Sequence, residues 1–256
     1  MGKFVMVLTL LLIHFTATAS SSSAQEKKSS TSIALKSCFD KWIVAKKKYG
    51  HISGGNDYFD PSTIEERESE IGFLVGPEIV YSHPRFFARG SYLTGSNDFT
   101  NGGKGRRKNV ALDIGLGQKI GGFIGYRSVD FDFSNLQSEN IADHGISDMV
   151  WGLFVRKPPD KPGFNANLEV VFGFKATLNV YSNDKFKEET TIGEAEFTIG
   201  YRLKTLPLNL SVGYGIWEYD KPVRGYPYTP SLIIDKILER LENWGHEAIL
   251  KAAYSF

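Results

Sequence analysis

Residues 165–181, NANLEVVFGFKATLNVY, alternate between apolar and polar side chains. One face of an extended strand would carry Ala166, Leu168, Val170, Phe172, Phe174, Ala176, Leu178 and Val180. The other face would carry Asn165, Asn167, Glu169, Gly173, Lys175, Thr177 and Asn179, with Val171 as the exception. A period of two predicts a β-strand. This strand exceeds the usual ~5 or 6 residues and is long enough to cross a bilayer, which takes about 9 to 11 tilted residues.

The same alternation recurs along the chain. It is clear in 109–117, 148–156, 194–203 and 206–217, and we expect further strands at 69–81, 85–94 and 120–133. The last of these is less regular, because Arg127 interrupts its apolar face. Many antiparallel strands of this kind predict an all-β protein.

Alternation alone does not say which face is inside. A soluble barrel or sandwich buries the apolar face, whereas a membrane barrel turns it toward lipid and keeps a polar lumen. In the final strand, Trp244 lies on one side of the small apolar residues Ala248 and Ala252, and Tyr254 and Phe256 lie on the other. This spacing suits aromatic girdles at two membrane interfaces. Together with the strand lengths it favours the membrane barrel.

Composition excludes several other classes. Thirty Lys and Arg against 29 Asp and Glu leave a net charge of +1, so charge gives no case for a nucleic-acid partner. The single cysteine, Cys38, excludes an internal disulfide framework and a Cys-rich metal site. The histidines are too scattered to suggest metal ligands, and no motif suggests a cofactor.

The N-terminus has the pattern of an export signal. Lys3 precedes the apolar run FVMVLTLLLIHF, and small residues follow. The run is shorter than the ~20 residues that a spanning helix needs. We therefore expect residues 1–24 to be a cleaved signal peptide and the mature chain to begin with a flexible segment.

The terminal residues AILKAAYSF, with Tyr254 two before Phe256, resemble the C-terminal signal of bacterial outer-membrane β-barrel proteins. GPEIVY, FFARGSYLTG and GGFIGYRSVDFDF resemble stretches of small porin-like barrels and of barrels like outer-membrane protein A. The resemblance covers about residues 69–256 and implies a Gram-negative outer membrane, with lipid and lipopolysaccharide as surroundings. It also implies recognition of Tyr254 and Phe256 by the barrel assembly machinery.

The connections predict an up-and-down barrel. Short turns at 82–84, 118–119, 157–163 and 204–205 alternate with long polar segments at 95–108, 134–147, 182–190 and 220–243, as in outer-membrane barrels. Nine strands lie between 69 and 256, and an even number requires one more. The candidate lies at 34–49 within the N-terminal segment 25–68, but Leu35, Cys38, Phe39, Trp42 and Ile43 match helical spacing better. Ten strands is our prediction. Eight strands, with 69–81 left outside the barrel and a periplasmic helix at 34–49, is the alternative, which Pro77 within 69–81 slightly favours.

Function should depend on the inward face. Residues predicted to line the lumen are Glu78, Arg89, Asp113, Arg156, Glu169, Lys175, Glu194, Glu196, Arg202, Glu247 and Lys251, with Glu70 and Arg85 also predicted inward. A narrow barrel must pair such charges, since an unpaired buried charge is costly. This predicts a charge-paired lumen in a structural or weakly conducting barrel. The alternative is a narrow porin-like channel for small solutes.

Two other classes of function stay open. Lys104, Arg106, Arg107 and Lys108 in the predicted outer loop 101–109 suit lipopolysaccharide phosphates, which indicates a surface-binding module. Residues 230–244 show the spacing of a loop helix. A rim hydrolase would need Asp143, His144, Ser147 and Asp148 to meet, and nothing orients that histidine on a rigid strand. We therefore expect the protein not to be an enzyme.

Overall fold

The computed structural model describes residues 29–52, 62–100, 102–134, 144–157, 162–173, 176–179, 187–227 and 234–256. The described residues are all-β. Among them no helix is long and apolar enough to cross a membrane. The predicted signal peptide, 1–24, lies outside the described residues. The strands are β1 (Ser30–Ile52), β2 (Ser62–Glu68), β3 (Gly72–Ser82), β4 (Phe86–Asp98), β5 (Lys104–Leu116), β6 (Ile120–Ser134), β7 (His144–Lys157), β8 (Gly163–Gly173), β9 (Ala176–Asn179), β10 (Lys187–Arg202), β11 (Leu208–Pro227) and β12 (Ile234–Ser255).

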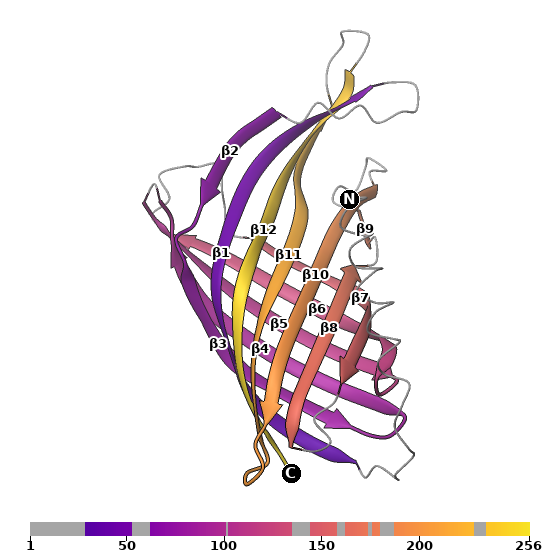
Figure 1. Ribbon diagram of the computed structural model, residues 1–256. Helices are drawn as coiled ribbons and strands as arrows, with labels where there is room; N and C mark the ends of the chain where they lie inside the picture. Colours follow the sequence, from indigo (N-terminus) through magenta and orange to yellow (C-terminus); the bar gives the residue numbers. More distant parts are fainter. Residues whose placement is uncertain are drawn as a thin grey trace.

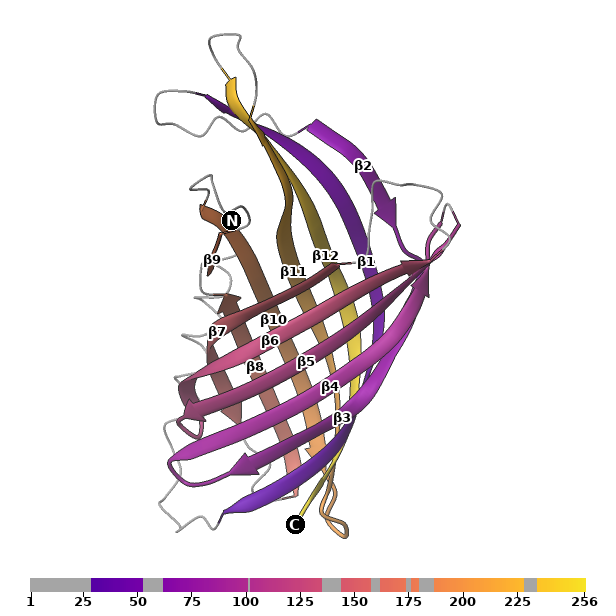
Figure 2. The ribbon, with the colours of Figure 1, turned by 180° about the vertical axis from the view of Figure 1, so that it is seen from behind.

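Ten of these strands form a closed antiparallel barrel (Figures 1 and 2). The order is β11, β12, β1, β3, β4, β5, β6, β7, β8 and β10, and the pairing of β10 with β11 closes the ring. The short strand β2 adds to β1, and β9 adds to β10. Closure leaves no strand edge exposed to hydrocarbon. The structure confirms the prediction of ten strands.

The barrel has two different ends. One end, here called the turn end, carries the short connections 83–85, 117–119 and 203–207 and the chain terminus after β12. The other, the loop end, carries the longer connections. There β1, β11 and β12 extend beyond the other strands, as the upper part of Figure 1 shows. Outer-membrane barrels keep short turns in the periplasm.

The segment predicted as either a first strand or a helix is strand β1. It pairs with β12 over Ser32–Ile52 and with β3 over Ser30–Asp40. The helical spacing was misleading because both faces of β1 carry apolar residues. Cys38 and Trp42 point into the barrel and are buried, whereas Leu35 and Phe39 are exposed on its outside.

Several predicted loops are strand instead. The loop predicted at 95–108 shrinks to a short connection, because β4 runs to Asp98 and β5 starts at Lys104. The helix predicted at 230–244 is wrong. From Ile234 onward this segment is β12, and Leu238 pairs with Tyr49. The long strand predicted over 165–181 ends at Gly173, and β9 follows as a separate strand.

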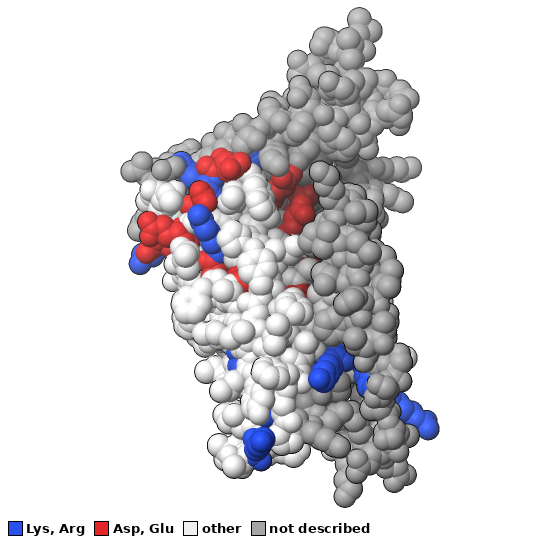
Figure 3. Space-filling model, viewed as in Figure 1, with Lys and Arg blue, Asp and Glu red and all other residues white. Residues whose placement is uncertain are grey.

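The outer surface of the barrel is apolar. On β5, Leu112 and Ile114 are 54% and 64% exposed, while Asp113 between them is 2% exposed. Aromatic side chains border this surface nearer the loop end at Phe39, Phe73, Tyr92, Tyr126, Trp151, Phe172 and Tyr214, and at the turn end at Tyr81, Phe86, Phe164, Tyr254 and Phe256. Figure 3 shows the uncharged band, with acidic and basic side chains above it and a few basic ones below. An outer band that is apolar and has aromatic borders is what a membrane barrel presents to lipid.

One stretch of the outer face departs from this pattern. Leu168 and Val170 share the parity of the exposed Phe172, and Leu168 pairs with the exposed Phe197, yet both are buried. Glu169, between them, points inward and is buried as well. The orientation predicted for this strand therefore holds for its polar face, although these two apolar side chains are less exposed than the others.

Candidate functional site

The interior of the barrel holds a network of ion pairs, and Arg89 on β4 is its first centre. Its Nε and Nη2 donate to Asp113 Oδ2 on β5, at 2.8 and 2.6 Å. Its Nη1 and Nη2 also donate to Glu169 on β8, at 2.9 and 2.5 Å. One guanidinium thus joins a neighbouring strand to a strand elsewhere on the barrel wall, using the fork geometry that suits carboxylates.

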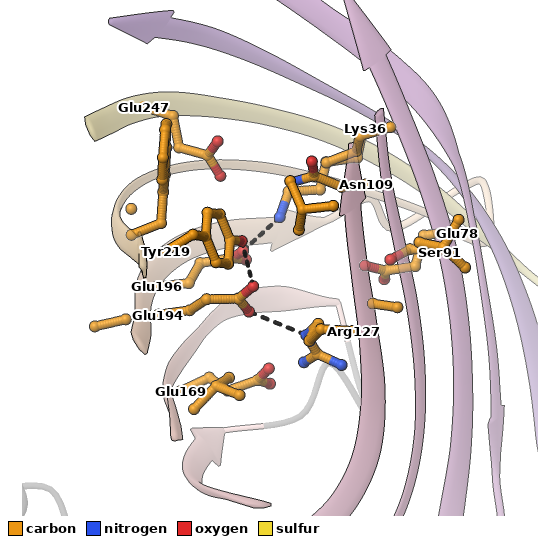
Figure 4. Close-up of a pocket in the computed structure, with 18 of the residues that line it drawn as sticks. Lys36, Glu78, Ser91, Asn109, Arg127, Glu169, Glu194, Glu196, Tyr219 and Glu247 are labelled. Carbon is orange, nitrogen blue, oxygen red and sulfur yellow. Dashed lines mark hydrogen bonds and ion pairs between the residues drawn. The ribbon is translucent and has the colours of Figure 1, made fainter. Parts of the chain in front are cut away.

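Arg127 on β6 is a second centre. Its Nη1 donates to Asp113 Oδ1 at 2.5 Å, and its Nε donates to Glu194 Oε2 at 3.1 Å. The other oxygen of Glu194 accepts the hydroxyl of Tyr219 at 2.6 Å. Figure 4 shows Tyr219, Glu194 and Arg127 in one chain of contacts. Asp113 therefore links the two arginine centres.

Arg107 on β5 is the third centre and is only 1% exposed. It donates to Asp40 on β1 at 3.3 Å and to Glu247 on β12 at 2.9 Å. Its guanidinium lies 4.3 Å from the ring centre of Trp217, whose Nε1 donates to Asp40 at 3.1 Å. The cation is thus held by two carboxylates and one aromatic face.

Two lysines complete the network. Lys36 Nζ lies 2.5 Å from Glu196 Oε2, and Lys251 donates to Glu78. Lys36 belongs to β1 and Glu196 to β10, which are separated on the barrel wall by β12 and β11. Several of these contacts therefore bridge the lumen rather than run along its wall.

Mutual pairing offsets the free-energy cost of burying these charged side chains. Breaking a buried pair by removing one partner typically costs about 3–5 kcal/mol, because it leaves an uncompensated charge. Each carboxylate named above has a cationic or hydroxyl donor in the described part of the chain. The network thus acts as a polar core that cross-links the barrel wall.

Aromatic layers lie on both sides of the charges. Toward the loop end, Trp42 stacks on Phe131 at 5.1 Å and on Phe133 at 5.6 Å, and it also contacts Phe99 and Trp217. Toward the turn end, the Arg156 guanidinium lies 3.8 Å from the ring centre of Phe154 and 4.5 Å from that of Phe87. Both layers narrow the lumen.

A small cavity remains at the centre. It measures about 80 Å³ and is lined by charged side chains of the network, including Lys36, Glu78, Arg89 and Glu247 (Figure 4). Asn109 and Tyr219 also line it. A cavity of this size has room for several water molecules.

The structure places most of the residues predicted for the lumen inside the barrel. Those with a network partner or an interior aromatic contact are Glu78, Arg89, Asp113, Arg156, Glu169, Glu194, Glu196, Glu247 and Lys251. Arg202 is half-buried at the turn end of β10, and Lys175 lies outside the described residues. Glu70 and Arg85 were predicted inward but are exposed, because they precede β3 and occupy the β3–β4 turn.

The basic loop predicted at 101–109 needs correction. Lys104, Arg106, Arg107 and Lys108 all belong to β5, so alternate side chains point to opposite faces. Arg107 enters the interior, whereas Lys104 and Arg106 are exposed. Lys104 lies 3.6 Å from Asp98, and Lys108 lies 2.8 Å from Asp132. The four residues therefore do not form one basic surface.

Sequence reasoning did not assign Lys36, Asp40, Arg107, Arg127 or Tyr219 to the interior. Arg127 was hidden by apolar inward neighbours, since Phe123, Val129 and Phe131 share its face. Arg107 was missed because 101–109 was predicted as a loop, whereas Arg107 belongs to β5. Lys36 and Asp40 alternate with the exposed Leu35 and Phe39, a signal that reading 34–49 as a strand would have revealed.

Of the four rim residues weighed for hydrolysis, the structure describes the side chains of Ser147 and Asp148 only, and these two point to opposite faces of β7. Ser147 is exposed on β7, while Asp148, its neighbour on the opposite face, is buried. Asp143 lies outside the described residues. Among the described residues, no group of three or more His, Cys, Asp or Glu side chains has an arrangement that would hold a metal ion.

The last strand ends as an ordered part of the barrel. Tyr254 pairs with Ile33 on one side and with Leu208 on the other. The amide of Phe256 donates to Thr31 O at 2.8 Å, and the rings of Tyr254 and Phe256 meet edge to face at 5.0 Å. Both side chains are exposed at the turn end. Their role as an assembly signal stays a prediction.

Comparison with known proteins identifies the fold. No protein-family model and no curated protein sequence matches the chain. Among solved structures, the outer-membrane protease OmpT of Escherichia coli superposes with a TM-score of 0.51 at 10% identity, covering 93% of this chain and 99% of that one. The translocator domain of the autotransporter NalP from Neisseria meningitidis gives 0.32 at 13% identity, with coverages of 99% and 96%. A FadL homologue of Pseudomonas aeruginosa gives 0.28 at 7% identity, with coverages of 89% and 90%. The match to OmpT shows that the chain has the fold of a bacterial outer-membrane β-barrel, and its closed ring and apolar outer band place it in that membrane.

Proposed function

We propose that this protein is a closed outer-membrane barrel, structural or at most weakly conducting, rather than an open porin or an enzyme. One observation carries the proposal: ion pairs cross the lumen and leave a central cavity of about 80 Å³. We expect such a core to leave no path for solutes larger than a few water molecules. Aromatic layers above and below the charges support the same conclusion.

A lumen filled with paired charges suits a barrel that functions through its two ends rather than through a channel. The lumen of a narrow barrel is just filled by side chains, and wider barrels leave an aqueous channel. A barrel of ten strands is wider than one of eight, and here the long arginine side chains span the extra width. The strands β1, β11 and β12 then extend past the loop end, where such a barrel would present them outside the cell.

Planar-bilayer conductance of the purified protein tests this proposal. We expect the wild type to show no discrete conductance steps, or conductance steps far smaller than those of a variant whose lumen has been opened. That variant is Arg89→Ala/Asp113→Ala/Glu169→Ala, which removes one whole centre and leaves Arg127 paired with Glu194. Because Arg89 and both of its carboxylate partners are removed together, none of these three groups is left as an unpaired buried charge, and this variant should still fold.

A matched control replaces exposed charges at the loop end, Lys104→Ala/Asp98→Ala, and should leave the recording unchanged. Heat-modifiable migration on a gel verifies that each variant is folded before recording. Discrete conductance steps of the wild type, as large as those of the opened variant, would refute the closed lumen and establish the narrow channel instead.

A further inference from the structure

An apolar groove crosses the lipid-facing surface near the turn end. It measures about 460 Å³ and lies over β10, β11, β12 and β1. Its walls are Leu35, Ile199, Leu210, Val212, Leu250 and Ala252. The small side chains of Ser37 and Ala252 keep it open, and the aromatic pair Phe164 and Tyr201, 5.1 Å apart, lies toward the turn end. Because these residues are apolar, the groove suits a hydrocarbon chain.

Among the side chains that the structure describes at the turn end beside this groove, all the charged ones are basic. Within 82–86, 116–120, 156–157 and 202–208, no residue is Asp or Glu, and the basic residues are Arg85, Lys119, Arg156, Lys157, Arg202 and Lys204. Arg85, Lys157 and Lys204 are exposed. The loop end, by contrast, mixes both signs, as in the pairs of Lys41 with Glu68 and Lys108 with Asp132. The charge at the turn end thus favours an anion.

Lys204 lies on the turn that joins β10 to β11, the two strands that contribute Tyr201 and Leu210 to the groove. It follows Tyr201 by three residues and precedes Leu210 on the next strand. The amide of Leu203 donates to Leu208 O at 2.9 Å, and the amide of Ser255 donates to Pro207 O at 2.9 Å. These bonds fix the turn to both neighbouring strands. A cation is therefore held at the level where lipid headgroups meet the barrel.

We propose that this surface binds an anionic diacyl phospholipid of the periplasmic leaflet, such as phosphatidylglycerol. An acyl chain would lie in the groove, and the headgroup phosphate would contact Lys204, a compact point charge suited to phosphate. Every lipid in the leaflet can fill an apolar groove, so charge must provide the selectivity. No described side chain of the turns is acidic, so none of these side chains would attract the ammonium group of a zwitterionic headgroup.

Native mass spectrometry of the detergent-purified protein tests the proposal, with dioleoyl-phosphatidylglycerol and dioleoyl-phosphatidylcholine as probes. We expect phosphatidylglycerol to be retained in preference. Lys204→Gln should lower that retention about fivefold, the usual effect of one basic residue at an anionic membrane surface, and leave phosphatidylcholine unchanged. Ala252→Phe, which fills the groove, should lower retention of both lipids.

The matched controls are Lys104→Gln at the loop end and Ala88→Phe on the outer face of β4, away from the groove, and neither should change retention. If Ala252→Phe fails to fold, Ser37→Leu fills the same groove from β1. Equal retention of the two lipids by the wild type would overturn the proposal, as would unchanged retention in Lys204→Gln. Stronger retention of lipid A than of phosphatidylglycerol would also overturn it, since that lipid belongs to the outer leaflet.

Discussion

At the scale of single residues, the interior depends on hydrogen bonds to charged groups. Tyr219 illustrates this, because its hydroxyl donates to Glu194 at 2.6 Å inside the barrel, while Tyr214 on the same strand is exposed on the lipid-facing side. A hydrogen bond to a charged group contributes about 1.5–3 kcal/mol, whereas the Tyr214 hydroxyl faces lipid and makes no such bond among the described residues. The two tyrosines thus form a natural pair for comparison.

Tyr219→Phe should lower the free energy of unfolding by about 1.5–3 kcal/mol. The same substitution at Tyr214 should change it by less than about 0.5 kcal/mol. Urea unfolding of the protein in phospholipid vesicles, followed by tryptophan fluorescence, measures both. Equal effects of the two substitutions would show that Glu194 does not depend on the Tyr219 hydroxyl.

At the scale of the strand, alternation in the sequence predicted a strand correctly where one face is polar and the other apolar. It failed where both faces carry apolar residues. The alternation in 109–117 is correct, since Leu112 and Ile114 face out and Asp113 faces in. β1 and β12 resembled helices because their inward faces also carry apolar residues, among them Trp42 and Leu241. A period of two disappears when neither face is polar.

Strand spacing imposes a second constraint that alternation does not reveal. At Gly76, β3 approaches β4 so closely that a Cβ atom would lie 1.8 Å from the carbonyl oxygen of Tyr92. Gly90 on β4 is different, since its nearest neighbour would be the Leu112 side chain at 3.4 Å. Only the first glycine is required by a backbone contact.

Gly76→Ala should therefore destabilise the barrel by about 1–3 kcal/mol, the range for overpacking, or prevent folding. Gly90→Ala should stay within about 0.5 kcal/mol of the wild type. The folded fraction on a heat-modifiable gel and the urea midpoint report both variants. A Gly76→Ala protein as stable as Gly90→Ala would contradict the close approach of β3 and β4.

At the scale of the whole molecule, the barrel and the inward direction of most charges could be predicted from the sequence, but not which charges would meet. Arg89 and Glu169 are 80 residues apart, and Lys36 and Glu196 are 160 residues apart. Such partners depend on strand order and on the stagger of the closed ring. Strand number was predictable through parity, whereas the lumen-crossing contacts of Arg107 required the three-dimensional structure.

The central claim is that the apolar face of the ring contacts lipid, which leaves the charged face to fill the interior. Its most direct test is the power saturation of a nitroxide attached to Leu112→Cys in phosphatidylcholine vesicles, in a Cys38→Ser background. We expect collisions with oxygen to exceed those with a water-soluble nickel complex. The reverse should hold for a nitroxide at Arg106→Cys, on the same face of β5 beyond the apolar band. A Leu112 label as accessible to the nickel complex as the Arg106 label would contradict the account.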